Sequence, residues 1–207
     1  MRKIGILTCV IFLPVLVIGF VVRGTFVNAN DLSYYTVATA GAHIVTALEN
    51  SAETIGENSA YILKVKCKTD TQFLFKKTYQ EAEVLEVFQG KEDVAKGDVI
   101  NISPGASHIF SDDDSINMGF VNEMRVDKEY LVFLGDKMTS VELEMDLYPT
   151  TEFIMTLIFG YEDRENNATA TGYVSYDELK DCEFFSETKA GIRKFLEAKN
   201  KLLEKYN

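Results

Sequence analysis

A short acidic run is the part of this sequence with the clearest potential for chemistry. Asp112, Asp113 and Asp114 follow one another, and Glu123 lies further along the chain. Hard cations such as Ca²⁺ take several oxygen ligands from an adaptable loop, so these four carboxylates are candidate calcium ligands. Asn117, however, stands where an EF-hand loop needs its glycine. The alternative is an acidic, solvated loop with Asp-type turns.

Motifs of known enzyme classes are scarce. The sequence has no G-x-S-x-G, H-E-x-x-H or C-x-x-C motif and no glycine-rich phosphate loop. Its two histidines, His43 and His108, stand apart from each other. We therefore predict a non-enzymatic protein with no catalytic residue, and with no cofactor unless the acidic run binds Ca²⁺.

Cys67 and Cys182 are the two cysteines that follow the first 29 residues. In an oxidising compartment an even pair can form a disulfide, and this pair would close a long loop. The alternative is that both are small buried side chains, as free cysteines often are. Sequence leaves both interpretations open.

The first part of the chain sets the compartment. Residues 4–22 carry no charge and follow Arg2 and Lys3. A run of about 20 apolar residues crosses a bilayer as one helix, and the basic pair is expected to stay in the cytoplasm. Alternatively, Val27-Asn28-Ala29 ends a signal peptide that is cleaved after Ala29. We predict a cell-membrane protein with its domain outside, or a secreted protein if the leader is cleaved.

The region after the leader is strongly acidic. All 32 Asp and Glu residues follow Arg23, whereas Arg2, Lys3 and Arg23 account for three of the 21 Lys and Arg residues. The remaining 18 basic residues against 32 acidic ones give a net charge of −14. Because nucleic-acid binding needs clustered Lys and Arg, we exclude that partner. We expect another envelope or extracellular protein instead.

Residue patterns divide the chain into four segments. They are a leader (1–29), a helical lead-in (30–58) that is interrupted near Asn50-Ser51, a β-barrel (59–174) and a C-terminal helical segment packed on the barrel (175–207). In the last segment Ser186 is the expected cap of an amphipathic helix. The fold class is therefore mainly β with flanking helices (α+β).

Within the barrel, alternation is the main signal. Tyr61, Leu63, Val65 and Cys67 alternate with lysines, which predicts a half-buried strand with these four side chains inward. Further strands are expected at 73–88, 99–102, 129–134 and 171–174. A strand at 141–148 is expected to form a hairpin with 153–159. Many short strands with frequent turn signals are typical of an antiparallel barrel.

Three runs of residues resemble a known family. They are Ala82-Glu83-Val84-Leu85-Glu86-Val87-Phe88-Gln89-Gly90, Lys96-Gly97-Asp98-Val99-Ile100-Asn101-Ile102 and Asp127-Lys128-Glu129-Tyr130-Leu131-Val132-Phe133-Leu134. Over about residues 51–136 the chain is similar to the netrin-like modules, OB-type barrels that include the inhibitory domain of tissue inhibitors of metalloproteinases and many bacterial exported proteins. The resemblance implies an OB-like antiparallel barrel.

The points at which this chain differs from the netrin-like family bear on its function. The metalloproteinase inhibitors chelate zinc with a mature N-terminal cysteine, whereas Cys67 lies inside a predicted strand here. We therefore expect a protein-binding module of the cell envelope, either membrane-anchored or secreted. The alternatives are a protease inhibitor or regulator that acts by another route, and a metal-dependent hydrolase centred on residues 112–114.

Overall fold

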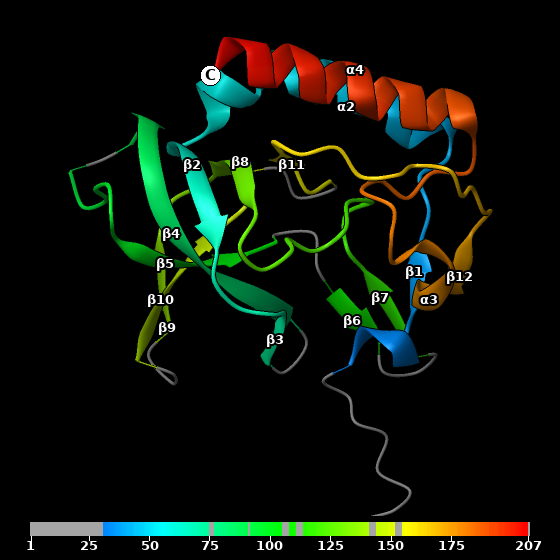
Figure 1. Cartoon of the computed structure of the whole chain (residues 1–207), viewed down its shortest axis with the longest axis horizontal. Helices are drawn as coiled ribbons and strands as arrows, with labels where there is room; N and C mark the ends of the chain where they lie inside the picture. The colour runs from blue at the N-terminus through cyan, green and yellow to red at the C-terminus, as the bar shows by residue number, and fades with distance from the viewer. Residues whose placement is uncertain are drawn as a thin grey trace, which may run out of the picture.

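Two sheets and a pair of long helices make up the structure (Figure 1). The computed structural model describes residues 31–74, 77–90, 92–104, 108–110, 114–140, 144–151 and 155–206. In chain order the elements are η1 (Leu32–Tyr34), β1 (Thr36–Ala38), α2 (Ala42–Asn58), β2 (Tyr61–Cys67), β3 (Gln72–Leu74), β4 (Lys77–Gln89), β5 (Val99–Ser103), β6 (His108–Phe110), β7 (Ser115–Asn117), β8 (Glu129–Leu134), β9 (Met138–Ser140), β10 (Met145–Pro149), β11 (Ile158–Gly160), β12 (Tyr173–Ser175), α3 (Tyr176–Leu179) and α4 (Lys189–Lys205). The fold is mixed α+β and mostly sheet, as the sequence predicts.

The larger sheet has the strand order β11-β8-β2-β4-β5-β10-β9, and β3 pairs with β4 outside this path. Its neighbours are antiparallel except for β10 and β5, which run parallel with Leu147 beside Asn101. The prediction of an entirely antiparallel arrangement is therefore wrong at this pair. The sheet is open, although an isolated bridge joins Leu134 at the end of β8 to Thr150 just beyond β10.

The predicted hairpin between residues 141–148 and 153–159 is also wrong. β11 pairs with β8, where Phe159 lies opposite Leu131, and β10 pairs with β9 and β5. Phe159 and Leu131 are both fully buried. Burial of this apolar pair against the helices outweighs the proximity of 153–159 to β10 along the chain.

The smaller sheet has the order β12-β1-β7-β6. The predicted helical lead-in over residues 30–58 is wrong at its start. Residues Thr36–Ala38 form strand β1, and the helix begins only at Ala42. Val37 lies between Val174 of β12 and Ile116 of β7 and is fully buried. Aromatic and β-branched residues around it, Tyr35 and Thr36, favour strand over helix.

Helix α2 continues through Asn50 and Ser51, where an interruption was expected. Asn50 is exposed, and its carbonyl accepts a hydrogen bond from the Thr54 hydroxyl at 3.4 Å. Leu48, Ala52 and Ile55 form the buried face of the helix. Packing along this face outweighs the weak helix propensity of the polar pair.

Helix α4 begins two residues later than expected. Thr188 is its N-cap, and the Thr188 hydroxyl accepts the amide of Gly191 at 3.0 Å. Ser186 instead donates its hydroxyl to the carbonyl of Ala40 at 3.3 Å. Ser186 is fully buried. Its hydroxyl links the segment before α4 to the segment before α2 and does not cap α4.

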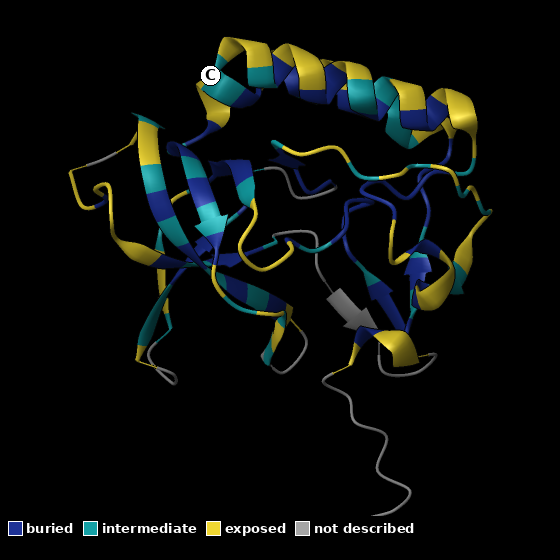
Figure 2. Cartoon of the chain, viewed as in Figure 1, coloured by how far each residue is buried: buried dark blue, intermediate teal, exposed yellow. Residues whose placement is uncertain are grey.

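The two long helices lie side by side across one end of the molecule (Figure 1). Lys194 pairs with Glu49 at 2.9 Å and Lys201 with Glu53 at 3.7 Å, so the helices run in the same direction. Their inner faces are buried, and their outer faces are exposed (Figure 2).

Three apolar cores hold these layers together. The first lies between the helices and the larger sheet and includes Leu48, Phe133 and Phe195. The second lies within the curve of the larger sheet; it contains Tyr61, Leu63, Val65 and Cys67 together, which confirms their predicted inward orientation. The third lies under the smaller sheet, where Val37 packs with Phe185.

A buried ion pair joins α4 to the segment that precedes it. The Lys199 ammonium lies 2.8 Å from Oε2 of Glu183, and the two side chains are 1% and 3% exposed. The other Glu183 oxygen accepts the amide of Gly160 at 3.0 Å. Burial raises the pKa of Glu183, and the bond to Lys199 opposes that rise.

The leader lies outside the part of the chain that the structure describes. The predicted span at 4–22 and the predicted cleavage after Ala29 therefore stay predictions. Within the described residues, every helix is too short or too polar to traverse a bilayer.

Candidate functional site

The two predicted calcium ligands that the structure describes have different surroundings. Asp114 is exposed on a turn with a φ of 50°, whereas Glu123 lines a narrow pocket. Among the described residues, no three Asp, Glu, His or Cys side chains gather as a metal site requires. Asp112 and Asp113 lie outside the described residues, so calcium binding by this run stays a prediction.

Cys67 and Cys182 are both free and buried. They belong to different cores, Cys67 to that of the larger sheet and Cys182 to that under the smaller sheet. Of the two interpretations left open, the disulfide is therefore not formed, and two small buried side chains are found. Burial raises the pKa of the Cys67 thiol to about 11, so this thiol stays protonated and poorly reactive at neutral pH.

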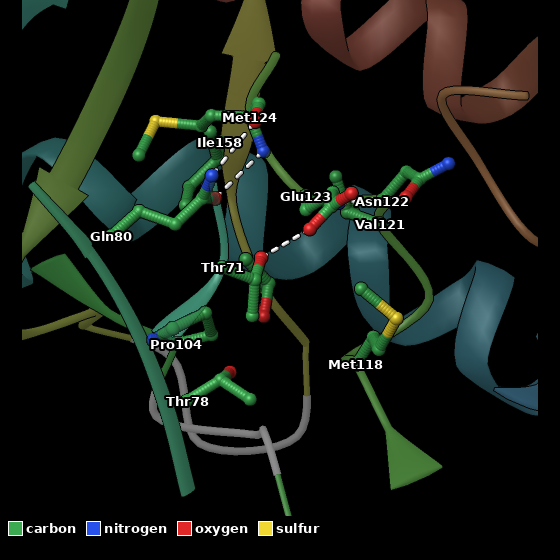
Figure 3. A pocket seen from close by; sticks show the side chains of 11 residues that line it. Thr71, Thr78, Gln80, Pro104, Met118, Val121, Asn122, Glu123, Met124 and Ile158 are labelled. Carbon is green, nitrogen blue, oxygen red and sulfur yellow. Dashed lines mark hydrogen bonds between the residues drawn. The ribbon is translucent and has the colours of Figure 1, made fainter. Parts of the chain in front are cut away.

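Glu123 lies in a pocket at the junction of the two sheets (Figure 3). Thr71, just before β3, donates its hydroxyl to one carboxylate oxygen. Tyr176, the first residue of α3, donates to the other oxygen at 3.3 Å. Burial raises the pKa of Glu123, because the charged carboxylate loses contact with water.

Gln80 fixes the same segment to β4. Its side-chain oxygen accepts the Met124 amide at 2.9 Å, and its Nε2 donates to the Met124 carbonyl at 2.7 Å (Figure 3). The space beside these groups measures about 20 Å³. Thr156, 2% exposed, lines it with a hydroxyl that has no partner among the described residues. This pocket has room for one water molecule and for no larger ligand.

A second candidate is the outward surface of β4, β5, β10 and β9. A row of side chains crosses it, since Glu81 lies opposite Asn101, Asn101 beside Leu147, and Leu147 opposite Met138. Val99 and Met138 are 59% and 47% exposed. We call this surface the outer face; it consists of Glu81, Glu83, Val99, Asn101, Met138 and Leu147. Leu147 is only 8% exposed, so Val99 and Met138 supply the exposed apolar area of the outer face.

Polar contacts hold the edge of the outer face in place. Strand β9 ends the path of the larger sheet, so one of its sides has no paired strand among the described residues. Lys137, just before β9, lies 3.1 Å from Asp93 and 3.4 Å from Asp146. The Tyr61 hydroxyl donates to Asp93 at 3.0 Å, and burial raises the pKa of Tyr61 to about 12.

The outer face contains no residue that the sequence singled out as a site. The alternation of Val99, Ile100, Asn101 and Ile102 shows which residues share a side of the strand. It does not show which side the rest of the chain covers. Only the structure shows that Val99 faces outward. This exposure is unusual, since a half-buried strand normally places valine inward.

Comparison with known proteins adds no family. No family model matches the chain, and no curated protein matches it in sequence. The likeness of residues 51–136 to netrin-like modules therefore remains a resemblance.

Proposed function

We propose that this protein is a non-enzymatic extracytoplasmic module that binds another protein of the cell envelope through its outer face. The exposed apolar side chains of Val99 and Met138 carry the proposal. They lie on one side of the sheet, and the buried Leu147 of β10 lies between the two strands that hold them. A partner that covers them removes apolar area from water, which is the main favourable term in association.

The architecture supports a netrin-like OB module within residues 59–174. The order β8-β2-β4-β5-β10, with its bridge between Leu134 and Thr150, agrees with the five-stranded, partly open barrel of OB folds. Such barrels carry many functions, so the fold supports a scaffold for binding and does not select the partner.

Chain organisation supports the proposed location. Residues 4–22 hold the domain outside the cell membrane, or cleavage after Ala29 releases it. A tagged chain that stayed soluble inside the cell with Met1 attached would refute this location.

Charge and topology indicate the manner of binding. Glu81 lies beside the apolar side chains of the outer face, whereas Glu83 pairs with Lys68 at 3.1 Å. A partner with a basic residue beside an apolar contact is therefore complementary at Glu81. The unpaired side of β9 also suits the addition of an extended peptide as a further strand.

Paired variants test the outer face. The full-length protein in mild detergent is used to capture partners from envelope extracts of its own cells. Val99→Glu combined with Met138→Glu should lose the captured protein, because two exposed apolar contacts become charged. Tyr173→Glu is the matched control, since Tyr173 is 57% exposed on β12 of the other sheet.

Equal capture by the outer-face variant and by the wild type would refute the surface. A captured protease whose activity changes on binding would turn the proposal towards the regulator considered above. Circular dichroism of the wild type and both variants distinguishes a folding defect from a loss of binding.

A further inference from the structure

We propose that Asn167 is the acceptor of an N-linked glycan, which is added on the outer side of the cell membrane. Asn167, Ala168 and Thr169 form the Asn-X-Thr pattern of such acceptors, with a residue other than proline in the middle. They lie in the loop between β11 and β12. Because this modification takes place outside the cytoplasm, the inference rests on the location proposed above.

The sequence contains a second match to the pattern, Asn101-Ile102-Ser103, and the structure distinguishes the two. This second match lies within β5. The Asn101 Nδ2 donates to the Asp146 carbonyl at 3.0 Å. Ser103 is 5% exposed, and its hydroxyl donates to the Thr78 carbonyl at 2.9 Å. A transferase reaches these two side chains only if the sheet opens, so Asn101 is a poor acceptor.

Exposure alternates along the loop that contains Asn167. Glu165, Asn167 and Thr169 are exposed, whereas Asn166 and Ala168 between them are half-buried. Alternate side chains of an extended segment point to opposite sides, so the acceptor amide and the threonine hydroxyl lie on the same, outward side. Transferases of bacterial envelopes also recognise an acidic side chain two residues before the acceptor, and Glu165 supplies it on that side.

The inward side chains fix this part of the loop to the fold. Oδ1 of Asn166 accepts the amides of Glu183 and Phe184, each at 3.0 Å. Ala168 packs against the core under the smaller sheet. Asn166 is therefore committed to the structure, and the loop presents Asn167 to solvent at a defined position.

The Asn167 amide keeps a hydrogen for the reaction. Its Nδ2 has two hydrogens and donates one of them to Oε2 of Glu165 at 3.0 Å. In the transfer, Nδ2 forms a bond to C1 of an oligosaccharide carried by a lipid pyrophosphate. The bond between C1 and the pyrophosphate oxygen breaks, the lipid pyrophosphate leaves, and one proton passes from Nδ2 to the transferase. The chain supplies only the acceptor; a membrane transferase and the lipid-linked oligosaccharide supply the rest.

A glycan on Asn167 is compatible with the fold and with the outer face. The loop leads to β12, on the opposite side of the molecule from β5, β9 and β10 (Figure 1), so the glycan leaves the outer face open. A glycan on Asn101 would instead break the bond from β5 to Asp146 of β10 and would cover that face.

Mass spectrometry of the full-length protein from its own cells tests the site. After digestion with trypsin, Asn167 lies in the peptide 165–180 and Asn101 in the peptide 97–125. We expect the added mass of an oligosaccharide on peptide 165–180 and an unmodified peptide 97–125.

Variants test the acceptor and the hydroxyl separately. Asn167→Gln and Thr169→Ala should each lose the added mass, whereas Thr169→Ser, which restores a hydroxyl, should keep it. Asn101→Gln is the matched control and should keep the oligosaccharide on peptide 165–180. Asn167 and Thr169 are exposed, so circular dichroism should show that these variants fold as the wild type does.

A separate measurement of location distinguishes the possible failures. The protein is tested for presence in the medium and for cleavage by protease added to cells with an intact cytoplasmic membrane. An exported protein without oligosaccharide on peptide 165–180 refutes the site and leaves the proposed location standing, whereas an internal protein refutes both. Oligosaccharide on peptide 97–125 alone, or its retention in Thr169→Ala, also refutes the assignment of the site.

Discussion

Glu183→Gln removes the negative partner of the buried Lys199 ammonium. Glutamine keeps an oxygen for the Gly160 amide, which lies 3.0 Å from Glu183, so the change isolates the charge. Loss of one member of a buried ion pair costs about 3–5 kcal/mol. The Asp163 carboxylate and the Glu162 carbonyl still lie 3.3 Å from the ammonium, so we expect about 3 kcal/mol, at the lower end of that range.

Urea unfolding of the full-length protein in mild detergent, followed by circular dichroism, measures this loss. The midpoint should fall while the slope of free energy against urea stays the same. Lys194→Gln is the matched control, because it breaks the exposed pair with Glu49 and should leave the midpoint close to that of the wild type.

A double variant separates the charge from other effects of the substitution. Glu183→Gln with Lys199→Met should recover part of the lost stability, because the unpaired buried charge is removed as well. A loss below about 1 kcal/mol for Glu183→Gln alone, within the range of ordinary surface changes, would refute the reasoning.

Three further changes probe other parts of the fold. Phe195→Ala should lower the unfolding free energy by about 3–5 kcal/mol, measured by urea unfolding, because Phe195 is fully buried and stacks on Phe184 at 5.0 Å. Gly191→Ala should cost about 1–3 kcal/mol, since its Cβ would clash with the Ser186 hydroxyl; Ser186→Ala should restore part of this in the same assay. Burial raises the folded pKa of Glu123 above its ordinary value of 4.5, so the folded state binds this proton more tightly than the unfolded state. Stability should then fall as pH rises from about 4.5 through the folded pKa, and Glu123→Gln should flatten that decline in melting temperature; an unchanged slope would contradict the direction of the shift.

Local patterns predict individual strands well and their partners poorly. The alternation of residues 61–67 indicates both a strand and its buried side, because neighbouring side chains on a strand point to opposite faces. The parallel pairing of β10 with β5 joins residues that are far apart in sequence. No local period encodes such a pairing, and the segment that follows β10, residues 153–159, is the wrong partner for it.

The surroundings of site residues are harder to predict for the same reason. Glu123 was identified as an acidic side chain, but its partners Thr71 and Tyr176 are 52 and 53 residues away.

The shared core of α2 and α4 has a consequence for the order of assembly. Helix α2 is synthesised before the whole of the larger sheet, yet Leu48 and Ile55 pack in a core that also needs Phe195 and Leu202 of α4. Until residues 189–205 have emerged, the apolar side of α2 lacks the part of its cover that α4 supplies. The growing chain therefore exposes part of this apolar surface to chaperones until α4 has been made. A chain truncated before residue 189 should aggregate rather than yield a smaller stable domain.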